Sequence, residues 1–435
     1  MNGKKETLKL PCEVYEKVLQ EIIEKELNLL PEDCIKEYAA GSAKGDNYLG
    51  IVYRINVKSK KDKNSFLNVI AKLPPQNASR REQFSANFCF LRECQFYDII
   101  VPMYKEFQIE KGINVETDGF HHTAKCYKTF NEEPTEGIFL EDLKPLNFEM
   151  FDRLKEVTKD QVFLVMKTLA KLHAISFAIQ DQKPDKIKDF TEMIDFFTHQ
   201  CYKDNSGMKL WFEKLMKQGL DVLRKSKNPD LIKRVENALQ NNLELVVREC
   251  TNSKEIFPYA AISHGDCWNN NIMYKYDENG EAVDIRLLDF QILRYATPVC
   301  DLMYYIFGCT RKSLRDKYYQ EFIDVYYEEL SSFIIRLGSD PKKVYPREIF
   351  DEQLKKFGKF GLAMAMILLP IFTSDVDDVP DLDDLAEKLQ ELQSTENGHK
   401  EFDEGFLEFT SSKTIDKYEE RMMGVFIDMY NLDYV

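Results

Sequence analysis

The chain has 435 residues with 44% hydrophobic and 31% charged side chains, a composition typical of a globular protein with a large buried core. Its formal net charge of −15 disfavours nucleic acid or an anionic membrane surface as a partner, because both bind a basic face. The ten cysteines form no C-x-x-C pair, and the N-terminal sequence MNGKKETLKL lacks the apolar core of a secretory signal. We therefore expect a cytoplasmic protein with reduced thiols, no membrane association and no obligate protein partner.

The first elements expected are one helix and two strands. Apolar residues recur at helical spacing over 12–29, and strand patterns cover 35–41 and 48–57. The strands enclose a polar, glycine-bearing turn, GSAKGDNYLG. One interpretation is a loop that covers nucleotide phosphates, formed with Gly45, Asp46 and Asn47, because glycines permit close approach of backbone N–H groups to phosphate oxygens. An ordinary hairpin turn is the alternative, and no G-x-x-x-x-G-K-[ST] motif occurs.

The next strand, 66–73, carries Lys72 near its end. Kinases place the lysine that binds the α- and β-phosphates on such a strand, after a glycine-bearing loop. A helical stretch over 79–104 follows and contains Glu93 among apolar neighbours. We expect an ion pair between Lys72 and Glu93, with Glu82 and Glu106 as lesser alternatives. A solvated lysine at a sheet edge is the simpler interpretation of Lys72 alone.

Two further strands, 123–130 and 137–140, precede a change from strand to helix composition at Glu141-Asp142-Leu143. In a two-lobed kinase this change marks the hinge, where adenine forms hydrogen bonds with backbone groups. The candidates are the Glu141 carbonyl and the Leu143 amide. This boundary predicts an N-terminal lobe of residues 1–143 and a C-terminal lobe of residues 144–435.

Helical periodicity dominates from residue 158 onward. His173 lies on the apolar face of the first of these helices. We expect a core histidine there, and a hydrogen bond toward the loop near residue 264 is the more specific alternative. The other helical stretches cover 188–203, 207–225, 228–250, 311–337, 345–372 and 410–429.

Two segments within this helical part need separate interpretation. The longest apolar run, 361–372, has 12 residues, too few to cross a bilayer, and is expected to be a buried helix. The acidic segment 375–384 is expected to be a solvated loop. A calcium site is the alternative, but the spacing lacks the glycine and terminal glutamate of an EF-hand.

The most specific motif is ISHGDCWNNNI followed by LLDFQ. Asp266 lies five residues before Asn271, and Asp289 follows a short apolar hairpin, which is the spacing of kinase catalytic and metal loops. In that chemistry the carboxylate of Asp266 orients an acceptor hydroxyl and receives its proton. The amide oxygen of Asn271 and the carboxylate of Asp289 hold Mg²⁺ against the triphosphate. A surface hairpin with incidental acids is the alternative.

Two residues are expected to support this loop without reacting. His264 would anchor the loop backbone. Asp301 falls near the N-terminus of a helix that Pro298 opens, where a carboxylate caps backbone amides and, if buried, braces the catalytic loop.

Together these motifs resemble the ecdysteroid kinase-like family of arthropods, which belongs with the aminoglycoside phosphotransferase and choline kinase group. The resemblance covers nearly the whole chain and rests on GSAKGDNY, VIAK, FLRECQFY, LEDL, LAKLHA, HGDCWNNNI and DFQ. It implies an α+β, two-lobed protein-kinase-like fold with a small mixed α/β N-lobe and a large, mainly helical C-lobe. It also implies ATP and Mg²⁺ as cofactors, and phosphorylation of a small-molecule alcohol such as an ecdysteroid or a dietary toxin. Asp266 would then be the catalytic base, Asn271 and Asp289 the Mg²⁺ ligands, and Lys72 with Glu93 the phosphate pair.

The departures from eukaryotic protein kinases narrow the acceptor class. Gly265 replaces the arginine of H-R-D, Gln291 replaces the glycine of D-F-G, and only nine residues separate Gln291 from Asp301. The chain therefore lacks the long activation loop on which peptide substrates dock. Two alternatives stay open: a choline- or ethanolamine-type kinase, and a catalytically silent nucleotide- or steroid-binding pseudokinase.

Overall fold

The computed structural model describes residues 8–41, 50–62, 64–152, 155–201, 207–374, 382–393 and 414–435. Three of the residues assigned to the phosphate loop, Gly45, Asp46 and Asn47, lie outside this part of the chain, as does the acidic segment up to residue 381.

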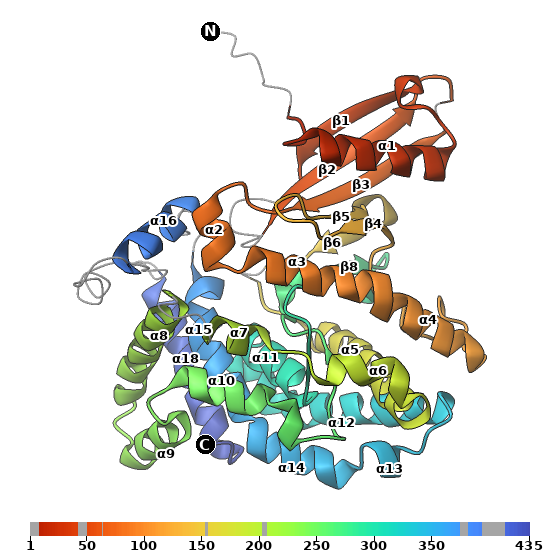
Figure 1. The fold of residues 1–435 in the computed structure, drawn as a ribbon. Helices are drawn as coiled ribbons and strands as arrows, with labels where there is room; N and C mark the ends of the chain where they lie inside the picture. Colours follow the sequence, from red (N-terminus) through yellow and green to blue (C-terminus); the bar gives the residue numbers. More distant parts are fainter. Residues whose placement is uncertain are drawn as a thin grey trace.

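A five-stranded antiparallel sheet with the order β1-β2-β3-β5-β4 forms the N-terminal part of the molecule. Its strands are β1 (Cys34–Ala40), β2 (Ile51–Ser59), β3 (Phe66–Leu73), β4 (Cys126–Phe130) and β5 (Gly137–Glu141). Helix α1 (Glu13–Leu27) lies across the sheet, as Figure 1 shows, and buries Tyr15, Leu19 and Ile23 against strand residues such as Val69. The predicted helix at 12–29 therefore packs on the sheet of the first lobe. Together they form a hydrophobic core separate from that of the helical lobe.

The predicted helix over 79–104 is wrong as a single element. The structure has α2 (Ala78–Gln83), α3 (Ala86–Gln95), a π-helical turn η2 (Phe96–Ile100) and α4 (Val101–Glu110). The first break lies at Ser85, whose φ of +50° is left-handed and cannot continue a right-handed helix. The π-turn inserts extra backbone directly after α3, the helix that carries Glu93. Figure 1 shows α3 and α4 passing between the sheet and the helical part.

The C-terminal part is mainly helical and contains the larger core. Its helices are α5 (Lys159–Gln182), α6 (Pro184–Thr191), α7 (Phe196–Cys201), α8 (Gly207–Arg224), α9 (Pro229–Leu239), α10 (Leu243–Thr251), α11 (Val299–Cys309), α12 (Lys312–Arg336), α13 (Pro341–Val344), α14 (Arg347–Phe357), α15 (Lys359–Thr373), α16 (Leu382–Gln393) and α18 (Ile415–Asn431). The fold is thus α+β with a small mixed lobe and a large helical lobe, and this prediction is confirmed.

Three of the predicted long helices are divided in the structure. The stretch 188–203 is interrupted between the end of α6 at Thr191 and the start of α7 at Phe196. The stretch 228–250 breaks at Gln240 and Asn241, both of which have positive φ. The stretch 345–372 bends by 48° at Gly358, between α14 and α15.

The first helix of the large lobe, α5, starts at a capping box in which Thr158 and Gln161 each accept a backbone N–H of the other. This helix is long and apolar enough to cross a membrane by length and composition, but 78% of its most apolar window is buried inside the protein. It packs along α12 as a core helix.

Two small sheets inside the large lobe carry the loops of the candidate site. Strands β6 (Phe148–Met150), β8 (Ile272–Tyr276) and β9 (Ala282–Leu287) pair in the order β6-β8-β9. Strands β7 (Ala261–Ser263) and β10 (Arg294–Ala296) form an antiparallel pair. The catalytic-type loop, residues 264–271, connects β7 to β8. The metal-type loop, residues 288–291, follows β9, and a short segment connects it to β10. Because β8 pairs with β9 and β7 pairs with β10, the two loops lie side by side.

Candidate active site

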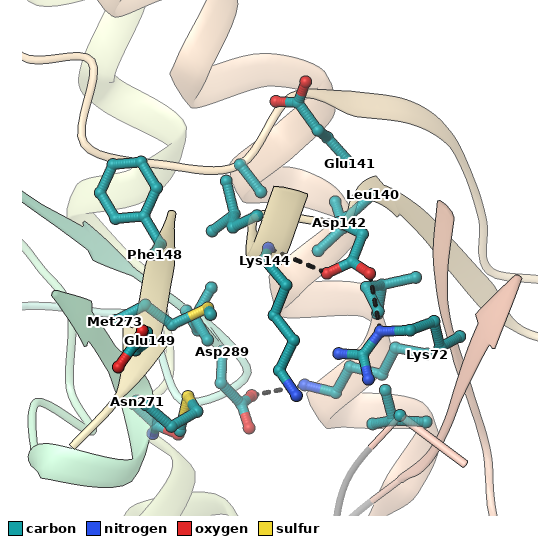
Figure 2. A pocket seen from close by; sticks show the side chains of 18 of the residues that line it. Lys72, Leu140, Glu141, Asp142, Lys144, Phe148, Glu149, Asn271, Met273 and Asp289 are labelled. Atoms are coloured by element: carbon teal, nitrogen blue, oxygen red, sulfur yellow. Dashed lines mark hydrogen bonds and ion pairs between the residues drawn. The ribbon is translucent and has the colours of Figure 1, made fainter. Parts of the chain in front are cut away.

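A cavity of about 710 Å³ lies between the sheet and the helical lobe, and Figure 2 shows its lining. Its wall includes Val52, Ile70, Lys72, Leu140, Glu141, Leu143, Phe148, Met273, Asn271, Leu288 and Asp289. Apolar side chains such as Val52, Ile70, Leu140 and Met273 line it together with charged and amide groups from both lobes. The cavity therefore offers apolar surface beside a set of polar contacts.

Lys72 is a buried cation of this cavity and is 6% exposed. Its Nζ lies 2.6 Å from Glu93 Oε2 and 2.5 Å from Asp289 Oδ1. Burial alone would lower the lysine pKa, but the carboxylates of Asp289 and Glu93 outweigh it, so the pKa is raised above the usual value. The predicted pairing with Glu93 is present. The alternative carboxylate Glu106 pairs with Lys186 instead, at 2.8 Å.

Asp266 lies in the loop between β7 and β8 and is fixed by two donors. Asn271 Nδ2 donates to its Oδ2 at 2.8 Å, and the Tyr304 hydroxyl donates to its Oδ1. Burial, helped by the nearby Asp289 carboxylate, raises the pKa of Asp266 to about 6, and the two hydrogen bonds oppose this rise. A carboxylate with a pKa closer to neutrality is a better proton acceptor than an ordinary aspartate.

Asn271 and Asp289 lie at adjacent ends of the β8–β9 hairpin, as predicted. The Leu288 N–H donates to the Asn271 carbonyl at 2.8 Å, which holds the two loops together. Because the Asn271 NH₂ group donates to both the main-chain carbonyl and the carboxylate of Asp266, its Oδ1 is the atom left for other contacts. Asp289 has a left-handed φ of +66°, and both side chains line the cavity. An amide oxygen and a carboxylate are hard oxygen ligands suited to Mg²⁺.

Asp301 braces the catalytic-type loop from the start of α11. It is 1% exposed and accepts the backbone N–H groups of His264 and Gly265 at 2.7 and 2.9 Å. His173 Nε2 lies 3.2 Å from the same carboxylate, and its Nδ1 lies 2.9 Å from the Tyr326 hydroxyl. Burial alone would raise the pKa of Asp301, but the hydrogen bond from His173 and the other contacts outweigh it and the pKa is lowered. His173 is thus the expected core histidine, and it reaches the catalytic-type loop only through Asp301.

His264 ties the two functional loops together. Its Nε2 lies 3.0 Å from the Leu288 carbonyl, and its Nδ1 lies 3.2 Å from the Asp266 backbone nitrogen. The ring also packs against Phe290, at 4.4 Å between centroids. Phe290 in turn stacks on Phe96 at 3.5 Å, from the π-turn that follows α3. The helix that carries Glu93 is thus packed directly against the loop that carries Asp289.

The predicted hinge segment lines the cavity with Glu141, Asp142 and Leu143. The Asp142 N–H donates to the Asn68 carbonyl on β3 at 3.1 Å, which ties the segment to the sheet. The adenine contacts of the Glu141 carbonyl and the Leu143 amide stay predictions. The side chain of Glu141 points away from the other lining groups in Figure 2.

Four site residues were not found from the sequence: Arg54, Asp142, Lys144 and Tyr304. Arg54 Nε donates to Asp142 Oδ2 at 2.6 Å, and the other Asp142 oxygen accepts the Lys144 backbone N–H at 3.1 Å. Figure 2 shows the Lys144 side chain extended across the cavity toward Lys72 and Asp289. In the sequence, only the acidic Asp142 inside the predicted hinge pointed to the contacts among Arg54, Asp142 and Lys144.

Comparison with known proteins agrees with this geometry. The model of the ecdysteroid kinase-like family matches residues 44–339, about two thirds of the chain. No curated protein sequence matches the chain.

Several solved structures are similar at low identity. A choline kinase from Cryptosporidium parvum Iowa II is 12% identical with a TM-score of 0.43, covering 97% of this chain and 98% of that chain. A Plasmodium vivax ethanolamine kinase is 12% identical with a TM-score of 0.39, covering 99% and 94%. A GDP complex of a mutant aminoglycoside 2'-phosphotransferase-IIIa is 9% identical with a TM-score of 0.40, covering 97% and 100%.

Proposed function

The chain belongs to the ecdysteroid kinase-like family, and we propose that it transfers the γ-phosphate of ATP to a hydroxyl group of a small, lipophilic molecule, either an ecdysteroid or a xenobiotic alcohol. One observation supports this proposal: Asn271 and Asp289 line a cavity that also holds the Lys72–Glu93 ion pair, and Asn271 donates to the carboxylate of Asp266 directly beside it. A surface hairpin with incidental acids would not bury and pair these groups.

In the proposed reaction the acceptor alcohol binds beside Asp266. Its oxygen forms a bond to the γ-phosphorus while the bond from that phosphorus to the β,γ-bridging oxygen breaks, and ADP leaves. The alcohol proton passes to the Asp266 carboxylate, which Tyr304 and Asn271 hold in place. Lys72 supplies a fixed positive charge to the phosphates, and Glu93 keeps that charge oriented.

The residues present fit a magnesium ion. Asn271 has its amide nitrogen occupied by Asp266, so its oxygen is free to bind a cation, and Asp289 adds a carboxylate. A bound Mg²⁺ would neutralise charge on the triphosphate. Lys72 Nζ lies 2.5 Å from Asp289 Oδ1, so the carboxylate that would hold the ion adjoins the lysine that would contact the phosphates.

A small acceptor suits the segment after the metal-type loop. Every residue from Phe290 to Thr310 is buried, including β10 and the whole of α11. In protein kinases the corresponding segment is a long exposed loop that is ordered by phosphorylation and contacts peptide. Here this surface is closed, which favours an acceptor that enters the cleft as a free molecule.

The test is a phosphate-transfer assay with purified protein, Mg²⁺, γ-labelled ATP and a panel of alcohols containing ecdysteroids, plant glycosides and choline. We expect the label on a lipophilic alcohol and its absence with Asp266→Asn. Label on choline alone would instead establish a choline-type kinase. ATP binding without transfer to any alcohol or to water would establish a pseudokinase.

A further inference from the structure

The catalytic-type loop has no side chain at the position where H-R-D kinases carry an arginine. Gly265 occupies it with a left-handed φ of +88°. A Cβ on this glycine would lie 2.1 Å from the Ile292 carbonyl oxygen, so the loop backbone runs in direct contact with the segment after the metal-type loop. Only glycine permits this approach.

A different arginine approaches the loop from that segment. Arg294 is the first residue of β10 and pairs with Ser263, the last residue of β7. It is 1% exposed, and its Nη2 donates to the Gly265 carbonyl at 3.2 Å. The guanidinium thus holds the main chain one residue before Asp266.

The same guanidinium is connected to two helices outside the loop. Asp195 Oδ2, at the start of α7, lies 3.2 Å from its Nε. The rings of Phe197 on α7 and Phe360 on α15 lie 5.5 and 5.6 Å from its Cζ, on the distance scale of cation–π contacts. Arg294 is therefore the charge at which α7, α15 and the catalytic-type loop meet.

Stability alone does not explain a buried arginine in this position. Its Nε and Nη1 find no aligned hydrogen-bond acceptor among the described residues, and neither does Asp195 Oδ2 find a donor. A buried ion pair with unsatisfied groups is commonly no more stable than a well-packed apolar side chain of similar size. The contact that Arg294 does make in good geometry is the one to the loop.

We propose that Arg294 is a positioning residue that takes the place of the missing H-R-D arginine: it fixes the Gly265 carbonyl, and through it the direction of Asp266, relative to helices α7 and α15. This inference rests on the proposed role of Asp266 as the catalytic base. It does not require that the acceptor be known, because it concerns the conformation of the loop.

The test compares Arg294→Met, which removes both charge and hydrogen bond, with Arg294→Gln, which keeps a donor for the Gly265 carbonyl. Hydrogen exchange of peptides covering residues 260–268 reports the loop directly, and thermal unfolding reports the fold. We expect Arg294→Met to exchange faster in this loop, and its melting temperature should fall as well, because the variant leaves the buried Asp195 carboxylate without its cation. Phosphate transfer, measured as hydrolysis of MgATP, should fall by about 100-fold in kcat with little change in KM for MgATP, whereas Arg294→Gln should retain much of the rate.

The matched control is Arg315→Met. Arg315 is also a buried arginine with a carboxylate, a carbonyl and a ring as neighbours, namely Asp428, Thr310 and Phe307, but it lies between α12 and α18. The Arg315→Met variant should lower the melting temperature and leave hydrogen exchange of the catalytic-type loop unchanged.

Equal loop exchange in wild type and Arg294→Met would overturn the positioning role. If Arg294→Met does not fold, wild-type loop exchange and rate in the double variant Asp195→Asn/Arg294→Met, which removes the carboxylate and the guanidinium together, would overturn it equally. An inactive wild type with faster loop exchange in Arg294→Met would count against the proposed function only.

Discussion

Tyr304, in the second turn of α11, donates its hydroxyl hydrogen to the carboxylate of Asp266, 38 residues earlier in the chain. The hydroxyl is fully enclosed and its pKa is raised well above the usual value, first by burial and then by Asp266, so it remains a donor at any physiological pH. Asp266 thus has one oxygen held by α11 and the other by Asn271. The proposed base is therefore held by a helix that a search for kinase loops alone would not include.

Replacing Tyr304 with Phe should weaken the proposed base without removing it. Loss of this donor frees the carboxylate to rotate, and we expect kcat to fall by roughly 10-fold with an unchanged KM for MgATP. Because the hydrogen bond favours the charged carboxylate, its loss should raise the Asp266 pKa and move the acid limb of kcat/KM to higher pH. Steady-state kinetics between pH 5 and 8 check both effects. Tyr305→Phe is the control, since the hydroxyl of Tyr305 lies 3.3 Å from Tyr274 and makes no contact with Asp266.

Lys144 should contribute to nucleotide affinity and not to the chemical step. It lines the cavity just after the hinge, and its side chain reaches toward Lys72 and Asp289. A solvated cation near a triphosphate contributes about 1 kcal/mol, so Lys144→Ala should raise KM for MgATP about 5-fold with kcat nearly constant. Titration with a non-hydrolysable ATP analogue checks the affinity. Lys254→Ala removes an exposed lysine remote from the cavity and should behave as wild type, and a Lys144→Ala variant with wild-type affinity would contradict the expectation.

The stability contribution of Asp301 should depend on pH in a defined direction. Its pKa in the folded protein is below the ordinary value of about 3.9, so its stabilisation is complete above that value and is lost as the pH falls toward the folded-state pKa. Asp301→Asn should therefore destabilise the protein by about 3 kcal/mol at pH 7, because two loop amides and His173 lose a charged partner. The difference between variant and wild type should shrink below pH 4.

Urea unfolding at pH 7, 5, 4 and 3 measures this difference. Asp316→Asn offers a comparison, since Asp316 forms an exposed pair with Lys312 and should change stability by only a few tenths of a kcal/mol. A stability gap for Asp301→Asn that stays constant down to pH 3 would mean that folding does not lower the pKa of Asp301, which would contradict the expectation.

The sequence predicted the parts of the site whose residues lie close to one another along the chain or on neighbouring elements. Asp266, Asn271 and Asp289 are joined by one hairpin, so their spacing alone predicts that they meet. Lys72 and Glu93 are further apart, yet a strand followed by a helix with one apolar-flanked glutamate was enough to pair them. Their contacts agree with the prediction, and their roles in phosphate and metal binding stay predictions.

Other parts of the site have no local signal. Tyr304 belongs to VCDLMYYIFGC, which resembles any apolar core helix, and Arg294 follows DFQIL with no motif of its own. The partners of Arg54 and Arg294 lie 88 and 99 residues away, at Asp142 and Asp195, so only the folded chain can identify them. The same limit explains the wrong helix over 79–104, because Ser85 adopts a left-handed conformation that its side chain does not favour.

The close approach at Gly265 can be tested separately from its backbone conformation. Two glycines with similar positive φ differ in their surroundings: Gly265 at +88° would place a Cβ 2.1 Å from the Ile292 oxygen, whereas Gly280 at +79° has open space. Gly280→Ala should therefore cost only about 1 kcal/mol, which is the cost of the left-handed conformation. Gly265→Ala must in addition displace backbone of the loop or of the segment at Ile292, and we expect a loss of several kcal/mol or a shifted loop.

The two outcomes for Gly265→Ala are distinguishable. If the loop keeps its position, the clash destabilises the protein, and urea unfolding shows a much lower midpoint than that of Gly280→Ala. If the loop is displaced instead, the free energy of unfolding stays nearly that of Gly280→Ala. Asp266 then moves away from Tyr304 and Asn271, and MgATP hydrolysis falls by about 100-fold. A Gly265→Ala variant that matches Gly280→Ala in both stability and rate would show that the loop and the segment at Ile292 are not in contact in solution, and would remove the structural basis for coupling Arg294 to Asp266.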